Sequence, residues 1–324
     1  WGSDRVQNFD ALREGTTPTS QCSDDEDTSD LAFDPERLLE VDITMSSEDY
    51  DAMRRQARRI LDVFGGDCGE APPESPYTWF PADVTVDGIT VLNAGVRKKG
   101  FFGSPSVTKP ALKIKFDEFG SEGTIYGLER LTLNNGLQDP SLLDMCLAYD
   151  LFHDAGLVAA RCSFAHVTVN GNDLGIYMNV DSIKDPFLVR NFGSAAGNLY
   201  EGTTADFREN WIGVFEKKNN EDGSELNAVA ETLLIEDDAQ FLTAIATVID
   251  MDKFMTYWAL SGLIGDWDGY MGNAIAYLAL EAGYEVVAHV PIERFAASVT
   301  DKLRAKYARS VSKGRISEQE VETK

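Results

Sequence analysis

The chain has 324 residues, of which 54 are acidic and 29 are Lys or Arg, giving a formal net charge of -25. A surface this negative repels polyanions, so nucleic acid and anionic lipid are disfavoured as partners. The hydrophobic fraction of 43% is that of an ordinary globular protein with a sizeable core. The length predicts about two domains or lobes, and no apolar run is long enough to predict a transmembrane segment.

Residues 1–33 are polar and acidic and include the run Ser23–Asp27. Few apolar residues and strong like charge predict a disordered leader, which could tether the protein to a membrane or a cell wall. Because the sequence begins at Trp1, the lack of a secretory signal says nothing about the compartment.

The cysteines leave two interpretations open. None belongs to a Cys-x-x-Cys pair, which disfavours a zinc site. An even number fits disulfides in an exported protein, with three connectivities to choose from, and it fits equally well a set of buried, reduced thiols. The four residues are Cys22, Cys68, Cys146 and Cys162.

A strand and a helix are predicted directly after the leader. Polar and apolar residues alternate over 40–45, the period of a half-buried strand. Ser46 followed three residues later by Asp49 resembles a capping box, and it predicts a helix that extends to about Val63.

Further strands are predicted in the first half of the chain. Asp87-Gly88 between β-branched residues predicts a hairpin over 84–91. Residues 111–116 form another predicted strand, with Lys113 and Lys115 on one face and apolar side chains on the other.

The second half is predicted to contain more helix. Asp139-Pro140 predicts a helix start, with Gly156 as its C-terminal cap. Asn170-Gly171 predicts a turn between strands over 164–169 and 175–180. Three more helices are predicted over 226–234, 238–248 and 252–264.

A basic segment stands out in this acidic chain. Between Arg97 and Lys115 there are several cations and no acid, and glycines allow the backbone to approach an anion closely. The segment predicts a phosphate site, although its spacing is not that of a Walker loop. The alternative is a solvated strand face that pairs with surface acids. The cations are Arg97, Lys98, Lys99, Lys109, Lys113 and Lys115.

A second segment, Asp266 to Asn273, has the composition of a catalytic loop. Asp268 and Asn273 have the offset of the catalytic Asp and the metal-binding Asn of protein kinases. The alternatives are an ordinary turn and a calcium loop, but an EF-hand would need Glu where Tyr277 stands. The three histidines, His153, His166 and His289, are scattered and are interpreted as structural.

With these segments in place, the chain resembles the CotH family of spore-coat protein kinases from about Phe33 to about Tyr284. The order of the motifs makes the resemblance specific. They are Val96–Gly100, Lys109–Phe116, Leu131–Asn135, Asp139–Ser141, Val169–Gly171, Gly175–Tyr177, Phe187–Gly193, Gly197–Glu201 and Gly265–Tyr270 with Asn273.

The resemblance implies an atypical two-lobed, protein-kinase-like α+β fold. A strand-rich N-terminal lobe is expected over 34–135 and a helix-rich C-terminal lobe over 136–293. The second lobe is expected to be truncated and to be followed by a divergent charged tail over 294–324.

The resemblance also implies ATP with Mg²⁺ or Mn²⁺ as cofactors. Asp268 matches the catalytic aspartate of the family and Asn273 its metal-side asparagine, and Asp266 in the same loop is a further metal candidate. The candidate for the phosphate-contacting lysine is Lys113, with Lys109 and Arg97 as second choices.

The chain departs from the family pattern at two places. After Pro291, Glu293 and Phe295 stand where the family has the two aspartates of a Trp-Asp-x-Asp segment. Glu293 is therefore the candidate for the second metal ligand, and its extra methylene would shift a metal ligand by about an ångström. Asp181 stands where Glu is more usual.

The sequence thus predicts an extracytoplasmic Ser/Thr kinase, secreted or at the cell surface, whose substrates are exported or surface proteins. The alternative is a pseudokinase-like adhesion or scaffold module without catalysis. A calcium-dependent structural protein is the third interpretation.

Overall fold

A computed structural model describes residues 28–58, 74–101, 104–120, 123–202, 205–207, 209–219 and 222–266. In this part of the chain, one group of strands closes into a barrel in the order β1-β2-β3-β4-β5-β7-β6. Neighbouring strands are antiparallel, except that β1 and β6 close the barrel in parallel. The strands are β1 (Leu38–Thr44), β2 (Phe80–Val86), β3 (Ile89–Lys99), β4 (Ala111–Lys115), β5 (Arg130–Asn134), β6 (Cys162–Val169) and β7 (Asn172–Val180).

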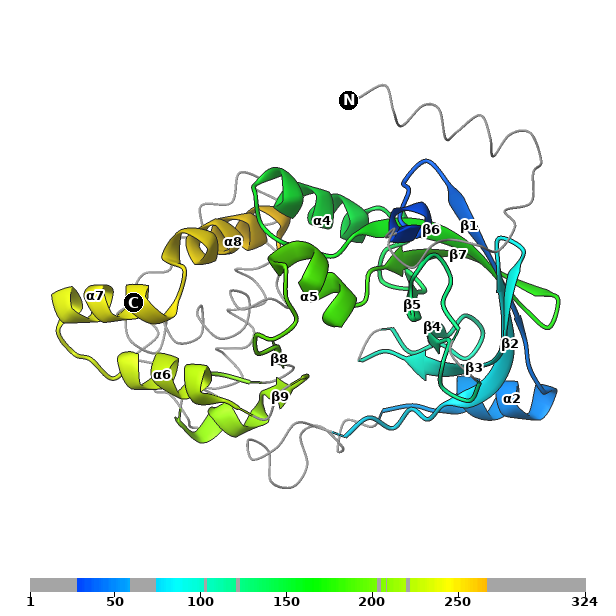
Figure 1. Ribbon diagram of the computed structural model, residues 1–324, viewed down its shortest axis with the longest axis horizontal. Coiled ribbons are helices and arrows are strands. Elements are labelled where there is room, and N and C mark those ends of the chain that lie inside the picture. Colours follow the sequence, from blue (N-terminus) through cyan, green and yellow to red (C-terminus); the bar gives the residue numbers. More distant parts are fainter. Residues whose placement is uncertain are drawn as a thin grey trace, which may run out of the picture.

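Figure 1 shows the barrel on one side of the molecule and most of the helices on the other. The α+β class predicted from the sequence is therefore confirmed. The sheet extends past residue 135, because β6 and β7 lie beyond it. Outside the barrel lie α4 (Asp144–Asp154), α5 (Asp185–Phe192), β8 (Tyr200–Glu201), η2 (Glu209–Val214), β9 (Glu216–Lys217), α6 (Ser224–Thr232), α7 (Asp238–Val248) and α8 (Met251–Ile264).

The barrel interior is filled by the apolar half of each alternating strand. On β4, Leu112 and Ile114 point inward and are fully buried, and Lys113 and Lys115 lie on the outer face as predicted. Lys98 is the exception, since it is also buried, with 1% of its surface exposed. Its Nζ donates to the carbonyl oxygens of Arg54 (2.8 Å) and Gln56 (2.7 Å).

Helix α2 (Ser47–Arg55) begins where the capping box predicted, since Ser46 Oγ accepts the Asp49 N–H at 3.0 Å. The predicted end near Val63 is wrong. Gln56 adopts an extended conformation, and its side chain exchanges hydrogen bonds with Thr78. Together with the hydrogen bonds from Lys98 to the carbonyl oxygens of Arg54 and Gln56, these contacts end the helix at Arg55.

Both predicted hairpin turns are confirmed. Asp87 (φ 48°) and Gly88 (φ 83°) join β2 to β3, and Asn170 (φ 52°) and Gly171 (φ 73°) join β6 to β7. Two successive residues with positive φ give the turn whose twist matches that of the strands.

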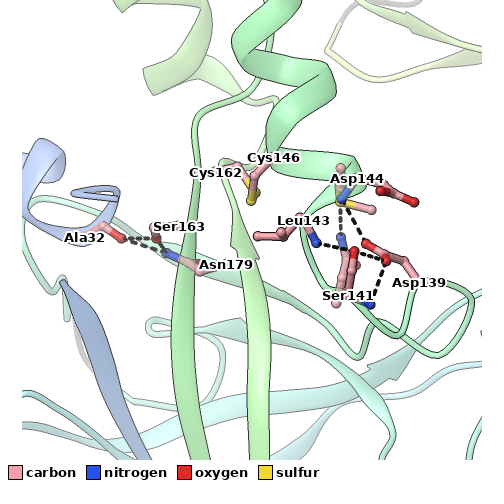
Figure 2. Close-up of a disulfide and its surroundings, with 11 residues drawn as sticks. Ala32, Asp139, Ser141, Leu143, Asp144, Cys146, Cys162, Ser163 and Asn179 are labelled. Atoms are coloured by element: carbon pink, nitrogen blue, oxygen red, sulfur yellow. Dashed lines mark hydrogen bonds between the residues drawn. A yellow bond between two sulfur atoms is a disulfide. The ribbon is translucent and has the colours of Figure 1, made fainter. Parts of the chain in front are cut away.

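The chain is already ordered at Thr28, within the stretch predicted to be a disordered leader. Residues 28–32 form the short helix η1 (Thr28–Ala32). Ser163 Oγ and Asn179 Nδ2 each donate to the Ala32 carbonyl at 2.8 Å, which fixes η1 at the end of the barrel (Figure 2). Residues 1–27 lie outside the described residues.

Helix α4 begins later than Asp139-Pro140 predicted. Asp139 Oδ1 accepts the Ser141 N–H and its Oδ2 accepts the Asp144 N–H, both at 2.9 Å, so Asp139 organises a turn ahead of the helix (Figure 2). Leu142 in that turn has a φ of 62°, and the helix starts only at Asp144. At the other end Gly156 has the positive φ of 78° expected of a cap.

A disulfide between Cys146 and Cys162 joins α4 to β6 (Figure 2). Around it pack Ala160, Met178 and Val180, which form a small second core on the outside of the barrel. For this pair the disulfide interpretation is confirmed, while Cys22 and Cys68 lie outside the described residues. No helix found in the described residues could cross a bilayer.

Candidate functional site

The candidate site begins on the outer face of β3 and β4. Strand alternation turns Lys98 into the barrel, so Arg97 and Lys99 on either side of it face outward. Arg97 is the register partner of Lys113 on the neighbouring strand. The two residues that the sequence singled out on β3 and β4 therefore lie side by side.

These cations are poorly solvated. Burial and the nearby Arg97 guanidinium lower the pKa of Lys113. Burial, together with Lys113 and Arg97, lowers the pKa of Lys99 to about 7. Lys99 Nζ donates to Asn134 Oδ1 at 2.5 Å. Loss of hydration and like charges both favour the neutral amine, so the two lysines would gain from an anion.

Lys115 provides the contrast on the same face of β4. Its Nζ contacts Glu118 Oε2 at 2.8 Å and Asp117 Oδ1 at 3.6 Å. The hydrogen bond to Glu118 raises the pKa of Lys115. Lys115 is therefore neutralised within its own turn, whereas Lys113 makes no ion pair with any described residue.

Arg97 is held by an aromatic ring rather than by an acid. Its Cζ lies 4.6 Å from the centroid of the Trp79 ring, a distance at which cation and ring attract. Its buried Nε has no hydrogen-bond acceptor among the described residues. Burial and the neighbouring Arg130 lower the pKa of Arg97. A planar donor with a spare N–H suits phosphate or carboxylate.

The hairpin formed by β8 and β9 carries two acids, Glu201 and Glu216. Among the described residues outside the barrel, they are the only acids whose charge raises the pKa of these lysines. Lys218 Nζ contacts Glu201 at 2.6 Å and Glu216 at 2.7 Å. Burial opposes the charge on Lys218, but these hydrogen bonds outweigh it and raise its pKa. Lys184, ahead of α5, has its pKa lowered by burial and by Lys218.

We call this group the cationic cluster. Its six cations outnumber the three described acids that attract them, Glu118, Glu201 and Glu216, in a chain whose overall charge is -25. A polyanion such as a phosphate chain would meet several donors with little competing negative charge. The residues present therefore fit nucleotide phosphates. The cluster consists of Arg97, Lys99, Lys113, Arg130, Lys184 and Lys218.

Lys109, the other lysine singled out from the sequence, lies elsewhere. Its Nζ donates to the Ile176 carbonyl at 2.7 Å and lies 5.0 Å from the centroid of the Tyr177 ring. Asn135 Nδ2 in turn donates to the Lys109 carbonyl at 2.8 Å. These contacts tie the loop before β4 to β7, and the structure does not bring Lys109 to Arg97 and Lys113.

The expected catalytic loop follows α8. Gly265 ends this helix with a φ of 70°, and the Asp266 N–H donates to the Ser261 carbonyl at 2.9 Å. The helix packs on α4, where the Phe152 and Tyr257 rings stack with centroids 5.9 Å apart. The helix predicted to present the loop is thus confirmed.

The remaining predicted site residues, Asp268, Asn273 and Glu293, lie outside the described residues. Among the residues that the structure does describe, no group of three or more His, Cys, Asp or Glu side chains could hold a metal ion. Asp266 is the one described member of the predicted metal set.

Part of the cluster was missed from the sequence. Lys99 belonged to the basic segment but was not singled out, because nothing local separates it from Lys98. Lys184, Lys218 and Arg130 come from distant segments and carry no motif. His166, by contrast, is structural as expected, since it bridges Glu40 (2.8 Å) and Asp173 (3.0 Å) on the barrel surface.

Comparison with known proteins places this geometry in a family. The model of the CotH kinase protein family matches residues 96–289, which include every member of the cationic cluster. The chain belongs to the CotH kinase protein family. A second, shorter match, to the NAD binding domain of 3-hydroxyacyl-CoA dehydrogenase, covers residues 262–324 and overlaps the end of the first.

Two curated relatives come from Bacillus subtilis (strain 168). The chain is 26% identical to inner spore coat protein H over 180 residues, which cover 51% of this chain and 49% of the relative. It is 32% identical to the inner spore coat protein H-like protein over 117 residues, covering 34% of this chain and 35% of that protein. The chain thus spans about half or less of the length of these relatives.

Proposed function

We propose that this CotH family member is an ATP-dependent Ser/Thr protein kinase that acts on exported or surface proteins. The observation that carries the proposal is the cationic cluster: desolvated lysines with few acids, within the family match of an otherwise acidic chain. Kinases work largely by positioning phosphates and stabilising their charge, and a cluster of this kind is suited to that task.

In this proposal Arg97 and Lys113 bind the phosphates from the barrel side. ATP with Mg²⁺ or Mn²⁺ supplies the phosphoryl group when bound. Asp268, four residues beyond Ile264 at the end of α8, accepts the proton of the substrate hydroxyl. Asn273, with Asp266 and Glu293, supplies oxygen ligands of the kind that hard cations prefer.

Two findings support an extracytoplasmic location. Both curated relatives are named as inner spore coat proteins or as similar to one. The Cys146–Cys162 disulfide is typical of proteins outside the reducing cytosol.

The first experiment is a thermal-shift titration with ATP and Mg²⁺. A ligand that binds only the native state raises the melting temperature by mass action. Lys113→Ala should weaken binding about tenfold to a hundredfold, since it removes a charged donor. Lys115→Ala is the matched control, because that lysine is already paired with Glu118, and it should bind like the wild type.

Catalysis is tested by transfer of radiolabelled phosphate from ATP to the protein itself or to a Ser-rich acceptor. Asp268→Ala should abolish the label while nucleotide binding is retained. Nucleotide binding without any label above that variant would instead support the pseudokinase-like alternative, which the Glu293 substitution favours. Absence of any nucleotide-dependent shift would contradict the kinase proposal.

A further inference from the structure

Lys99 differs from the other lysines of the basic segment. Lys98 donates to the backbone carbonyls of two residues at the end of α2, Lys109 to one strand carbonyl, and Lys115 to a carboxylate. Lys99 donates to a neutral amide oxygen, Asn134 Oδ1, at 2.5 Å. A neutral amine can make this bond as well as an ammonium can, so the site holds Lys99 in place without requiring its charge.

The charges around Lys99 come from three strands. Arg97 on β3 and Lys113 on β4 repel a proton on its Nζ, and Glu201 on β8 attracts one. Burial is the largest effect, and together with this repulsion it lowers the pKa of Lys99 to about 7. Because Glu201 is also engaged by Lys218 at 2.6 Å, its carboxylate is shared and only partly offsets the cations.

An anion that enters the cluster changes this balance. A phosphate chain beside Arg97 and Lys113 cancels their repulsion and adds its own attraction for a charged ammonium. We propose that Lys99 is a proton-dependent phosphate ligand: binding of a triphosphate chain to the cationic cluster is accompanied by uptake of one solvent proton by Lys99 Nζ. The proton adds to the lone pair of the amine, and no other bond changes.

This inference rests on the proposed function, and it adds a specific linkage between pH and affinity. When the free amine titrates near pH 7 and the bound one stays charged, affinity for a triphosphate falls about twentyfold between pH 7.5 and pH 9. At pH 8, where the terminal phosphate of the nucleotide is already ionised, binding should take up about 0.9 proton.

The test is isothermal titration calorimetry at pH 8 in two buffers of different ionisation enthalpy. The probes are a non-hydrolysable ATP analogue with Mg²⁺ and, separately, inorganic tripolyphosphate. The number of protons follows from the difference in binding enthalpy between the buffers. Binding constants from pH 7.5 to pH 9 are measured alongside.

Lys99→Arg is the decisive variant, because a guanidinium stays charged throughout this range. It should bind both probes with no proton uptake and with an affinity that does not change with pH. Asn134→Asp is a second variant: a carboxylate beside Lys99 favours the ammonium in the free protein, so uptake should disappear there too. Lys115→Ala should keep both the uptake and the pH dependence of the wild type.

The outcomes separate the two proposals. Nucleotide binding without proton uptake, or equal uptake in the wild type and Lys99→Arg, overturns the role of Lys99 and leaves the kinase proposal standing. Proton-coupled binding of tripolyphosphate without binding of the nucleotide supports Lys99 and overturns the nucleotide assignment. Binding of neither probe overturns both.

Discussion

The disulfide between Cys146 and Cys162 closes a loop with a sequence separation of 16 residues. Cross-linking a loop of this length lowers the entropy of the unfolded chain enough to stabilise the folded protein by about 3 kcal/mol. The bond also fixes α4 to the barrel, and α8 stacks on α4 through Phe152 and Tyr257. We therefore expect its loss to destabilise both the fold and the support of the segment that begins at Gly265.

The measurement is urea unfolding of the oxidised protein and of the same protein reduced with dithiothreitol. The experiment uses a Cys22→Ser/Cys68→Ser background so that only one pair of thiols is present. The variant Cys146→Ala/Cys162→Ala in that background should unfold like the reduced protein, and reductant should have no further effect on it.

A difference in unfolding free energy below about 1 kcal/mol between oxidised and reduced protein would refute this reasoning. So would two free thiols in the native background protein, as measured by labelling before unfolding. A change in the denaturant slope alone would show that the bond acts mainly through the compactness of the unfolded chain.

Three further predictions concern charged groups. Burial lowers the pKa of Lys99 to about 7 from 10.5, so the unfolded chain binds more protons than the folded protein between these values. The free energy of unfolding of the wild type, measured with urea, should therefore rise by about 2.5 kcal/mol relative to that of Lys99→Met between pH 6 and pH 9. Hydrogen bonds to Glu40 and Asp173 raise the pKa of His166 in the folded protein. The stabilisation from this side chain is therefore complete below its unfolded-state pKa of about 6.5, and it is lost as the pH rises through the folded-state pKa. His166→Gln should lower the melting temperature at pH 5.5 but not at pH 8.5. Asp181, with 4% of its side chain exposed, forms ion pairs with Arg161 and Arg190. Asp181→Ala leaves these two guanidinium groups without that partner, so it should lower the free energy of unfolding, measured with urea, by about 3 kcal/mol.

The sequence predicted correctly those turns and helices that are determined by residues close together in the chain. The turns at Asp87-Gly88 and Asn170-Gly171 need positive φ, and few residue pairs provide it as readily. Helix α7, over Asp238–Val248, has the predicted bounds because Asp237 accepts the Gln240 N–H at 2.9 Å and so caps it.

The predictions failed where contacts between residues far apart in the sequence determine the structure. Helix α2 ends at Arg55 because Lys98, some forty residues away, donates hydrogen bonds to the carbonyl oxygens of Arg54 and Gln56. Barrel closure by parallel pairing of β1 with β6 leaves no mark in either strand. The same holds for the candidate site: the sequence identified Arg97 and Lys113, which are cross-strand partners, but not Lys184 or Lys218.

The contrast between Lys113 and Lys115 shows what defines the site. The two lysines are two residues apart on one face of one strand, yet burial and Arg97 lower the pKa of Lys113, whereas the hydrogen bond to Glu118 raises that of Lys115. In a chain with 54 acidic residues, pairing a surface lysine is easy, and leaving a cluster of cations with so few acids is costly. A bound anion would offset this unfavourable free energy by pairing with the cations. The scarcity of acids around Lys113 and Lys99, rather than the number of lysines, is therefore the feature that indicates a ligand.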